Sequence, residues 1–175
     1  ESSMKVRSVL YLPASNARAI EKARTLDCDV AVLDLEDAVA PEAKIEARSA
    51  AVEAAKAGGF KPKLAVRINA LDTEWAEGDL QALKDAPVDL VVAPKIENEQ
   101  QIKAISDILR LDQRLWAMIE TPAALIDLKD IASAGGVLSG LMLGVNDLAK
   151  ELKTGSSPDR EPFKPWLASV VAHAR

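Results

Sequence analysis

Three carboxylates gather within four residues in the first quarter of the chain. Asp34, Glu36 and Asp37 follow Val30–Leu33, an apolar run typical of a strand that is covered on both faces. If strand alternation continues, Asp34 and Glu36 point to the same side. Because carboxylates this close repel one another and bind protons unless a cation lies among them, the sequence predicts a cation at this strand end.

Other polar residues stand where later apolar runs end. These runs finish on Arg67 with Asn69, on Pro94-Lys95, on Glu120-Thr121 and on Asn146-Asp147. If the strands are parallel and the sheet closes, their carboxyl ends face one mouth, as in barrel active sites. We therefore expect these side chains to lie around one site.

Glu120 and Asp147 are the predicted metal ligands. Mg²⁺ prefers oxygen donors and typically takes one or two carboxylates, with water and substrate oxygens completing its octahedron. The structural alternatives are an ion pair for Glu120 and a helix N-cap for Asp147.

Arg67 needs an anion because a guanidinium within an apolar strand cannot lose its charge. A substrate carboxylate bound in a bidentate manner is one candidate, and a salt bridge to Asp34 or Glu36 is the other. Both can hold, since the acids can orient the guanidinium for the ligand. Lys95 is predicted to be a second cation of the substrate site, with a Schiff-base nucleophile as the alternative.

The acidic turn also has a structural interpretation. Asp34, Glu36 and Asp37 can orient Arg67 or Lys95, bind metal-bound waters, or serve as a catalytic acid or base. Alternatively, they form a solvated turn. Lys44 and Arg48 are four residues apart on the following helix, so we expect that helix to supply countercharge to the turn.

Apolar runs and helical patterns alternate along the chain. The predicted strands are Val6–Leu12, Asp29–Leu35, Leu64–Asn69, Val88–Ala93, Leu115–Ile119 and Leu138–Leu143. The predicted helices are Asn16–Leu26, Pro41–Ala57, Thr73–Lys84, Asn98–Arg110, Pro122–Ala134 and Pro165–Arg175. Thr121 is the predicted N-cap of the fifth helix, with Pro122 at its first position.

Strict alternation of strand and helix predicts an α/β fold with a parallel sheet. An open doubly wound sheet that binds a nucleotide usually has a glycine-rich first turn, which Leu12–Asn16 lacks. Polar strand ends favour a (β/α)8 TIM barrel of which about six βα units are present. We expect one domain over residues 4–175, truncated at its C-terminus, with residues 1–3 an expression remnant.

Composition excludes several classes of function. The 175 residues carry a net charge of -5 with interspersed signs, which indicates neither a nucleic-acid surface nor a basic membrane patch. The sequence has no apolar segment of about 20 residues and no signal-peptide pattern. A single cysteine fits a reducing compartment, so a cytoplasmic location is expected.

Several motifs resemble the citrate lyase β-subunit (CitE-like) family of the HpcH/HpaI aldolase/citrate lyase superfamily. They are Arg7–Pro13, Leu33–Pro41 with Lys44 and Arg48, Val66–Asn69, Pro94-Lys95, Ile119–Thr121 and Gly144–Leu148. They occur in the family's order and span almost the whole chain.

The resemblance implies a (β/α)8 barrel, a homotrimer or hexamer, and Mg²⁺-dependent cleavage of a 3-hydroxy-acyl thioester of the citryl, malyl or citramalyl type. The products would be an α-keto acid, such as oxaloacetate or a related acid, and an acetyl thioester of CoA or an acyl carrier. It implies that Glu120 and Asp147 bind the metal and that Arg67 binds the keto-acid carboxylate. Later βα units and a lid present in the family are missing here. Alternatives are a class II pyruvate aldolase acting on a free hydroxy-keto acid, or a non-catalytic protein that binds keto acids and metal.

Overall fold

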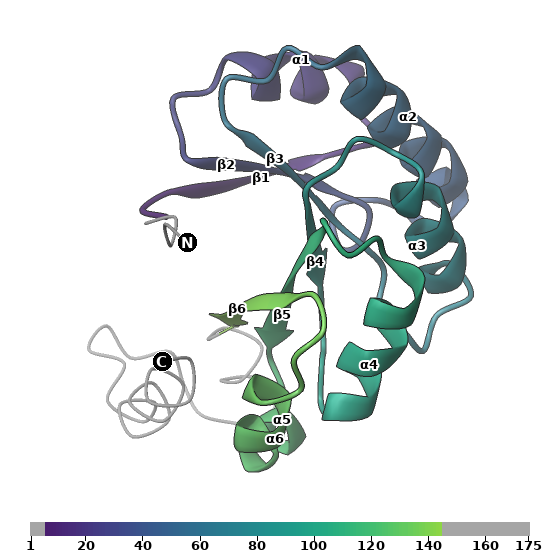
Figure 1. The fold of residues 1–175 in the computed structure, drawn as a ribbon. Helices are drawn as coiled ribbons and strands as arrows, with labels where there is room; N and C mark the ends of the chain where they lie inside the picture. The colour runs from purple at the N-terminus through teal and green to yellow at the C-terminus, as the bar shows by residue number, and fades with distance from the viewer. Residues whose placement is uncertain (1–5, 145–175) are drawn as a thin grey trace, which may run out of the picture. The chain divides into compact units, whose positions relative to one another are not determined.

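The computed structural model describes residues 6–144, in which strands and helices alternate (Figure 1). The strands are β1 (Val9–Pro13), β2 (Val30–Asp34), β3 (Lys63–Arg67), β4 (Leu90–Ala93), β5 (Arg114–Ile119) and β6 (Leu138–Leu143). They form a sheet with the order β1-β2-β3-β4-β5-β6, so the order of the strands in the sheet is their order in the sequence. The predicted α/β fold is confirmed, with six strands in residues 6–144 and at least one helix after each of the first five.

The helices agree with the predicted segments to within a few residues. They are α1 (Ala17–Thr25), α2 (Lys44–Ala57), α3 (Ala76–Lys84), α4 (Glu99–Ile108), α5 (Pro122–Ile126) and α6 (Leu128–Ala132), with the 3₁₀ turn η1 (Pro41–Ala43) before α2. The prediction of one continuous helix over Pro122–Ala134 is wrong. The chain leaves α5 at Asp127, a weak helix former that favours helix ends, and re-enters a helix at Leu128. The predicted helix Pro165–Arg175 lies outside the described residues.

The chain consists of two compact units, and the boundary between them lies between Val91 and Val92. In the first unit, β1, β2 and β3 pair in parallel, and all five residues of β2 are buried. A strand covered on both faces needs apolar residues on both sides, which explains the continuous run Val30–Leu33. Helices α1 and α2 lie together on one side of these strands (Figure 1).

The second unit contains the parallel pair β5–β6, with the short helices α5 and α6 beside it (Figure 1). The Thr121 side chain accepts a hydrogen bond from the Ala124 N–H at 3.2 Å, and Pro122 takes the first helical position. The predicted helix start is therefore confirmed. No helix within residues 6–144 is long and apolar enough to cross a membrane.

Candidate functional site

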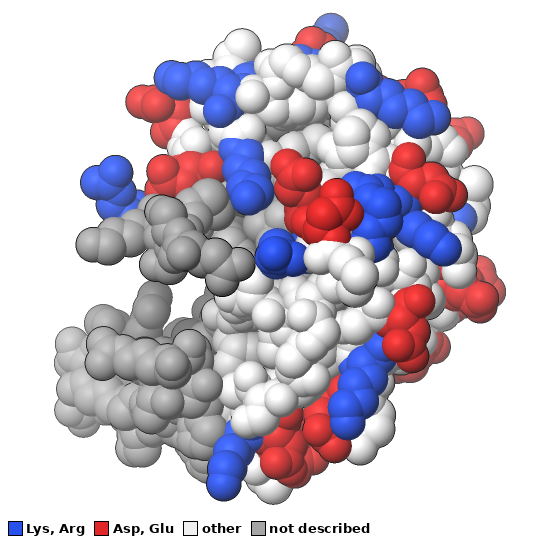
Figure 2. Space-filling model, viewed as in Figure 1, with Lys and Arg blue, Asp and Glu red and all other residues white. Residues whose placement is uncertain are grey.

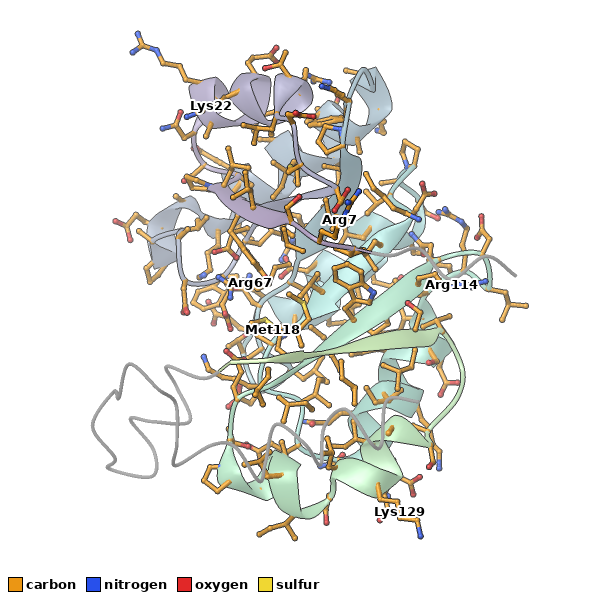
Figure 3. The ribbon with its side chains drawn as sticks, turned by 90° about the vertical axis from the view of Figure 1, so that its left-hand side faces the viewer. Arg7, Lys22, Arg67, Arg114, Met118 and Lys129 are labelled. Atoms are coloured by element: carbon orange, nitrogen blue, oxygen red, sulfur yellow. The ribbon has the colours of Figure 1, made fainter. Side chains whose placement is uncertain are left out.

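Arg67 and Asp34 form a bidentate ion pair at the carboxyl ends of β3 and β2. The two residues are register partners, so the pairing of the strands brings them together. Arg67 Nε lies 2.8 Å from Asp34 Oδ1, and Arg67 Nη2 lies 2.7 Å from Asp34 Oδ2. Arg67 is labelled in Figure 3, toward the opposite end of the strands from Arg7, which precedes β1. One edge of the guanidinium is thus bound by a single carboxylate in the geometry that matches it best.

Backbone groups hold the Asp34 carboxylate as well. Its Oδ1 accepts from the Glu36 N–H at 2.9 Å, and its Oδ2 accepts from the Ala38 N–H at 3.0 Å. Burial raises the pKa of Asp34, but the hydrogen bonds and charge of Arg67, together with these two N–H groups, outweigh burial and keep the pKa below its usual value. Asp34 is therefore an ionised, fixed carboxylate near neutral pH.

Glu36 and Tyr11 contact the same guanidinium. Glu36 is buried and its Oε1 lies 3.4 Å from Arg67 Nη1, while the Tyr11 ring centroid lies 4.9 Å from Arg67 Cζ. Asp34 and Glu36 thus meet one cation on the same side, as strand alternation predicts. Arg67 is the cation that the acidic turn requires, and its salt bridge to these acids is confirmed. Asp37 is exposed.

The prediction that α2 supplies countercharge to the acidic turn is confirmed for Lys44 and wrong for Arg48. Lys44 Nζ is buried and donates to the Leu35 and Glu36 carbonyls, both at 2.9 Å. Arg48 turns to α3, where its Nε lies 2.8 Å from Asp79 Oδ1. One helical face does carry both cations, but the first binds backbone dipoles of the acidic turn and the second pairs with an acid 31 residues away.

Asp79 is the site-adjacent residue that sequence reasoning missed. It is fully buried, and besides Arg48 it accepts from the Asn69 backbone N–H at 2.9 Å and from Asn69 Nδ2 at 2.8 Å. Asn69 therefore fixes the segment after β3 to α3, while Arg67 faces the acidic turn. A signal was present: Asp79 lies three residues after Ala76 and four before Leu83, on the buried stripe of the helix.

Glu120 follows β5 in the second unit as a buried carboxylate. It is 4% exposed, and its Oε2 accepts the Lys95 backbone N–H at 2.7 Å. Gly144 follows β6 directly and donates its N–H to the Ile119 carbonyl at 2.9 Å, which brings it against the Glu120 side chain. The side chain of Lys95 is exposed.

Glu120 has the chemistry of a hard-metal ligand, since it offers ionisable oxygens at a strand end. Within the part of the chain that the structure describes, no three His, Cys, Asp or Glu residues form a metal-binding group. Asp147, the other predicted ligand, lies outside the described residues.

Charges of both signs are interspersed on the molecular face shown in Figure 2. Lys and Arg side chains alternate with Asp and Glu side chains there. The strand ends differ from this surface because they carry the buried acids Asp34, Glu36 and Glu120 and the half-buried Arg67.

An α/β fold of this order, with charged side chains buried at the carboxyl ends of parallel strands, is typical of barrel enzymes. Residues 7–175 match the family HpcH/HpaI aldolase/citrate lyase, and the chain belongs to that family.

The chain is also similar to individual family members. It is 38% identical over 170 residues to a (3S)-malyl-CoA thioesterase of Cereibacter sphaeroides, covering 97% of this chain and 59% of the relative. It is 33% identical over 180 residues to citrate lyase subunit beta of Escherichia coli, covering 97% and 60%. The chain thus spans about three fifths of the length of these curated relatives.

The fold of the chain is also similar to those of solved structures. RipC from Yersinia pestis matches with a TM-score of 0.79 at 31% identity, over 97% of this chain and 71% of that one. CitE from Mycobacterium tuberculosis, in complex with magnesium, acetoacetate and coenzyme A, matches with a TM-score of 0.78 at 28% identity, over 95% and 60%. The strands and helices described above therefore correspond to part of the barrel in these CitE-like proteins.

Proposed function

We propose that the full-length protein is a Mg²⁺-dependent carbon–carbon lyase acting on a 3-hydroxy-acyl thioester of CoA. The observation that carries the proposal is the Arg67 guanidinium, which two carboxylates hold in a fixed orientation at the end of β3. Family membership and the malyl-CoA and citrate lyase relatives support the class of substrate.

Arg67 would bind the carboxylate of the hydroxy acid that becomes the α-keto acid. Asp34 holds the Nε and Nη2 edge, whereas the Glu36 contact with Nη1 is longer, at 3.4 Å. We assign the substrate carboxylate to the Nη1 side, where Glu36 keeps the guanidinium oriented. Because Arg67 is ordered before the ligand arrives, little side-chain entropy is lost on binding.

In the cleavage direction, the 3-hydroxyl loses its proton, the C2–C3 bond breaks, and the electron pair goes to the thioester enolate, which is then protonated at carbon. Asp37 is exposed and is the proposed proton carrier, with Glu36 as the other candidate acid or base. Lys95 would add positive charge beside the developing oxyanion.

Glu120, with Asp147, would hold the Mg²⁺. The bound ion would act as a Lewis acid that lowers the pKa of the substrate hydroxyl and polarises the forming carbonyl. Bound magnesium in CitE from Mycobacterium tuberculosis, also seen together with oxaloacetate, supports this assignment. We further propose that the protein is cytoplasmic and forms a homotrimer or hexamer. Light scattering on the purified protein would test the oligomeric state.

A second candidate is hydrolysis of the thioester, which the similarity to malyl-CoA thioesterases favours. In that reaction, water adds to the thioester carbonyl and the C–S bond breaks, so the C2–C3 bond survives. The same carboxylate-binding arginine would serve either reaction.

Product analysis separates the candidates. The full-length protein is incubated with (3S)-malyl-CoA and Mg²⁺, and the products are resolved by chromatography. A lyase gives glyoxylate and acetyl-CoA, whereas a thioesterase gives malate and free CoA. Pyruvate released from a free hydroxy-keto acid would identify an aldolase. Binding of oxaloacetate without turnover of malyl-, citramalyl- or citryl-CoA would contradict the catalytic proposal.

A further inference from the structure

The Glu120 carboxylate is enclosed by two backbone positions of the second unit. The Lys95 N–H binds its Oε2 at 2.7 Å, and Gly144 lies against its methylene carbons and Oε1. We propose that the backbone of Lys95 and the missing side chain of Gly144 position the Glu120 carboxylate for a divalent cation. This inference deepens the metal assignment of the proposed function and rests on it.

Lys95 has an unusual backbone conformation. Its φ is 52°, and among residues 6–144 it is the one non-glycine residue with a positive φ. A side chain at such a φ is strained, and the surrounding structure must stabilise it. The strained conformation directs the N–H of Lys95 onto a buried carboxylate while the side chain is exposed. The backbone conformation is therefore the feature that acts on Glu120, and the lysine side chain is not required for it.

The absence of a side chain at Gly144 leaves room for the Glu120 side chain. A Cβ at this position would lie 2.7 Å from Glu120 Cγ, closer than real Cβ contacts, and a tight 3.2 Å from Oε1. The backbone at Gly144 does not need a glycine for its own conformation, since its φ is not in the left-handed region. A methyl group here would therefore displace the Glu120 side chain and leave the local backbone unstrained.

Together the two contacts restrict how the carboxylate rotates. The Lys95 N–H fixes Oε2, and Gly144 lies against Cγ and Oε1, so the two contacts hold the carboxylate from two sides. Groups that orient a metal ligand in this way typically change metal affinity 10- to 100-fold when they are lost.

The chain offers a matched control for Gly144. Gly140 lies on β6, and a Cβ there would lie 2.8 Å from Trp116 Cδ1, an equally severe overlap with a packing residue. Gly144→Ala and Gly140→Ala therefore introduce the same methyl group and comparable crowding, but one reaches a carboxylate and the other an indole.

The experiment titrates Mn²⁺, an oxygen-preferring surrogate for Mg²⁺, into the full-length protein without substrate and follows free Mn²⁺ by electron paramagnetic resonance. We expect Gly144→Ala to weaken Mn²⁺ binding about 10-fold or more, and Gly140→Ala to change it less than about threefold. Thermal unfolding is measured in parallel to compare the steric cost of the two changes. Equal Mn²⁺ affinities for the two variants would overturn the role of Gly144.

A second pair of variants tests Lys95 independently. Lys95→Gly keeps the N–H and tolerates the positive φ, whereas Lys95→Val keeps the N–H but is strongly disfavoured at that φ. Both variants lose the ammonium group, so their comparison isolates the backbone, and we expect Lys95→Val to bind Mn²⁺ at least about 10-fold more weakly than Lys95→Gly. Equal Mn²⁺ affinities for the two variants, or the reverse order, would overturn the role of the Lys95 backbone.

Glu120→Gln separates this inference from the metal assignment. If Glu120→Gln binds Mn²⁺ as wild type does, Glu120 is not a ligand and the metal assignment fails. If Glu120→Gln loses Mn²⁺ while Gly144→Ala and Lys95→Val retain it, Glu120 is a ligand and the positioning inference alone fails.

Discussion

Two Arg–Asp ion pairs in the first unit each contain a buried aspartate but lie in different surroundings. Arg67 binds Asp34 at the carboxyl ends of β3 and β2, and Arg48 binds Asp79 between α2 and α3. The closest N–O distances are 2.7 and 2.8 Å, and both aspartates are 1% exposed or less. Burial and ion pairing alone therefore do not mark a functional arginine.

The partners of the two guanidinium groups distinguish them. Arg48 also donates to the Trp75 carbonyl at 2.9 Å and lies against Gly78, so neutral backbone surrounds its pair. Arg67 instead has a second carboxylate, Glu36, and an aromatic ring. An arginine whose second contact is a backbone carbonyl suits a structural link between helices. A guanidinium with a second carboxylate at 3.4 Å suits a site that exchanges contacts with a ligand.

The largest expected effect is a loss of stability when the Arg48–Asp79 ion pair between α2 and α3 is removed. Asp79→Ala leaves Arg48 without its counterion and breaks the bonds to Asn69, so we expect a loss of about 3–5 kcal/mol in the free energy of unfolding. Chemical denaturation measures it. Glu53→Ala removes the exposed ion pair with Lys56 and serves as a control, with an expected loss of at most about 0.5 kcal/mol. Similar losses for both variants would contradict the structural role.

Asp34→Asn tests the strand-end pair through its pH dependence. Because folding lowers the pKa of Asp34, its charge stabilises the folded state above the unfolded pKa of about 3.9, and this contribution disappears as pH falls through the folded pKa. We expect wild type to exceed Asp34→Asn by about 3 kcal/mol at neutral pH and the gap to shrink in acid. Denaturation curves between pH 2 and 7 measure the gap; a constant gap would rule out an ionised Asp34 as its source.

Arg67→Lys tests whether Arg67, unlike Arg48, binds the keto acid. Lysine keeps the charge but loses the planar fork, so we expect keto-acid binding weaker by about 2 kcal/mol. Calorimetry with oxaloacetate and Mg²⁺ measures the affinity. Arg48→Lys is the matched control and should leave that affinity unchanged. If both variants bind oxaloacetate equally well, Arg67 is structural in the same sense as Arg48.

The smallest expected effect comes from Tyr11. Its ring lies over the Arg67 guanidinium, and Tyr11→Leu removes this cation–π contact while keeping an apolar side chain. We expect keto-acid affinity to fall by about 0.5–1 kcal/mol. The same titration measures it, and an unchanged affinity in Tyr11→Leu would assign the ring to packing alone.

Local signals were sufficient for much of the fold and for part of the site. Alternating β and α patterns predicted all six strands, and the alternation at Asp34 and Glu36 predicted the ion pair with Arg67. The Arg48–Asp79 pair depends on how α2 and α3 pack, which the sequence spacing of 31 residues does not reveal.

The positive φ of Lys95 also escaped prediction, because lysine is rare in that conformation and no local pattern demands it. The break at Asp127 depends on a single weak helix former within an apolar helical pattern. The Lys95 conformation thus goes against local propensity, whereas the break at Asp127 follows it at one position.

The proposed lyase reaction requires both Arg67 and Glu120, because the keto acid would bind through the first residue and its divalent ion through the second. The direct measurement is the coupling between Mn²⁺ and oxaloacetate binding in the full-length protein, by calorimetry with each ligand in the absence and presence of the other. We predict that each ligand tightens the other by the same factor, about 10-fold or more, and that Arg67→Lys or Glu120→Gln abolishes the coupling. Independent binding of Mn²⁺ and oxaloacetate in the wild-type protein would contradict the claim.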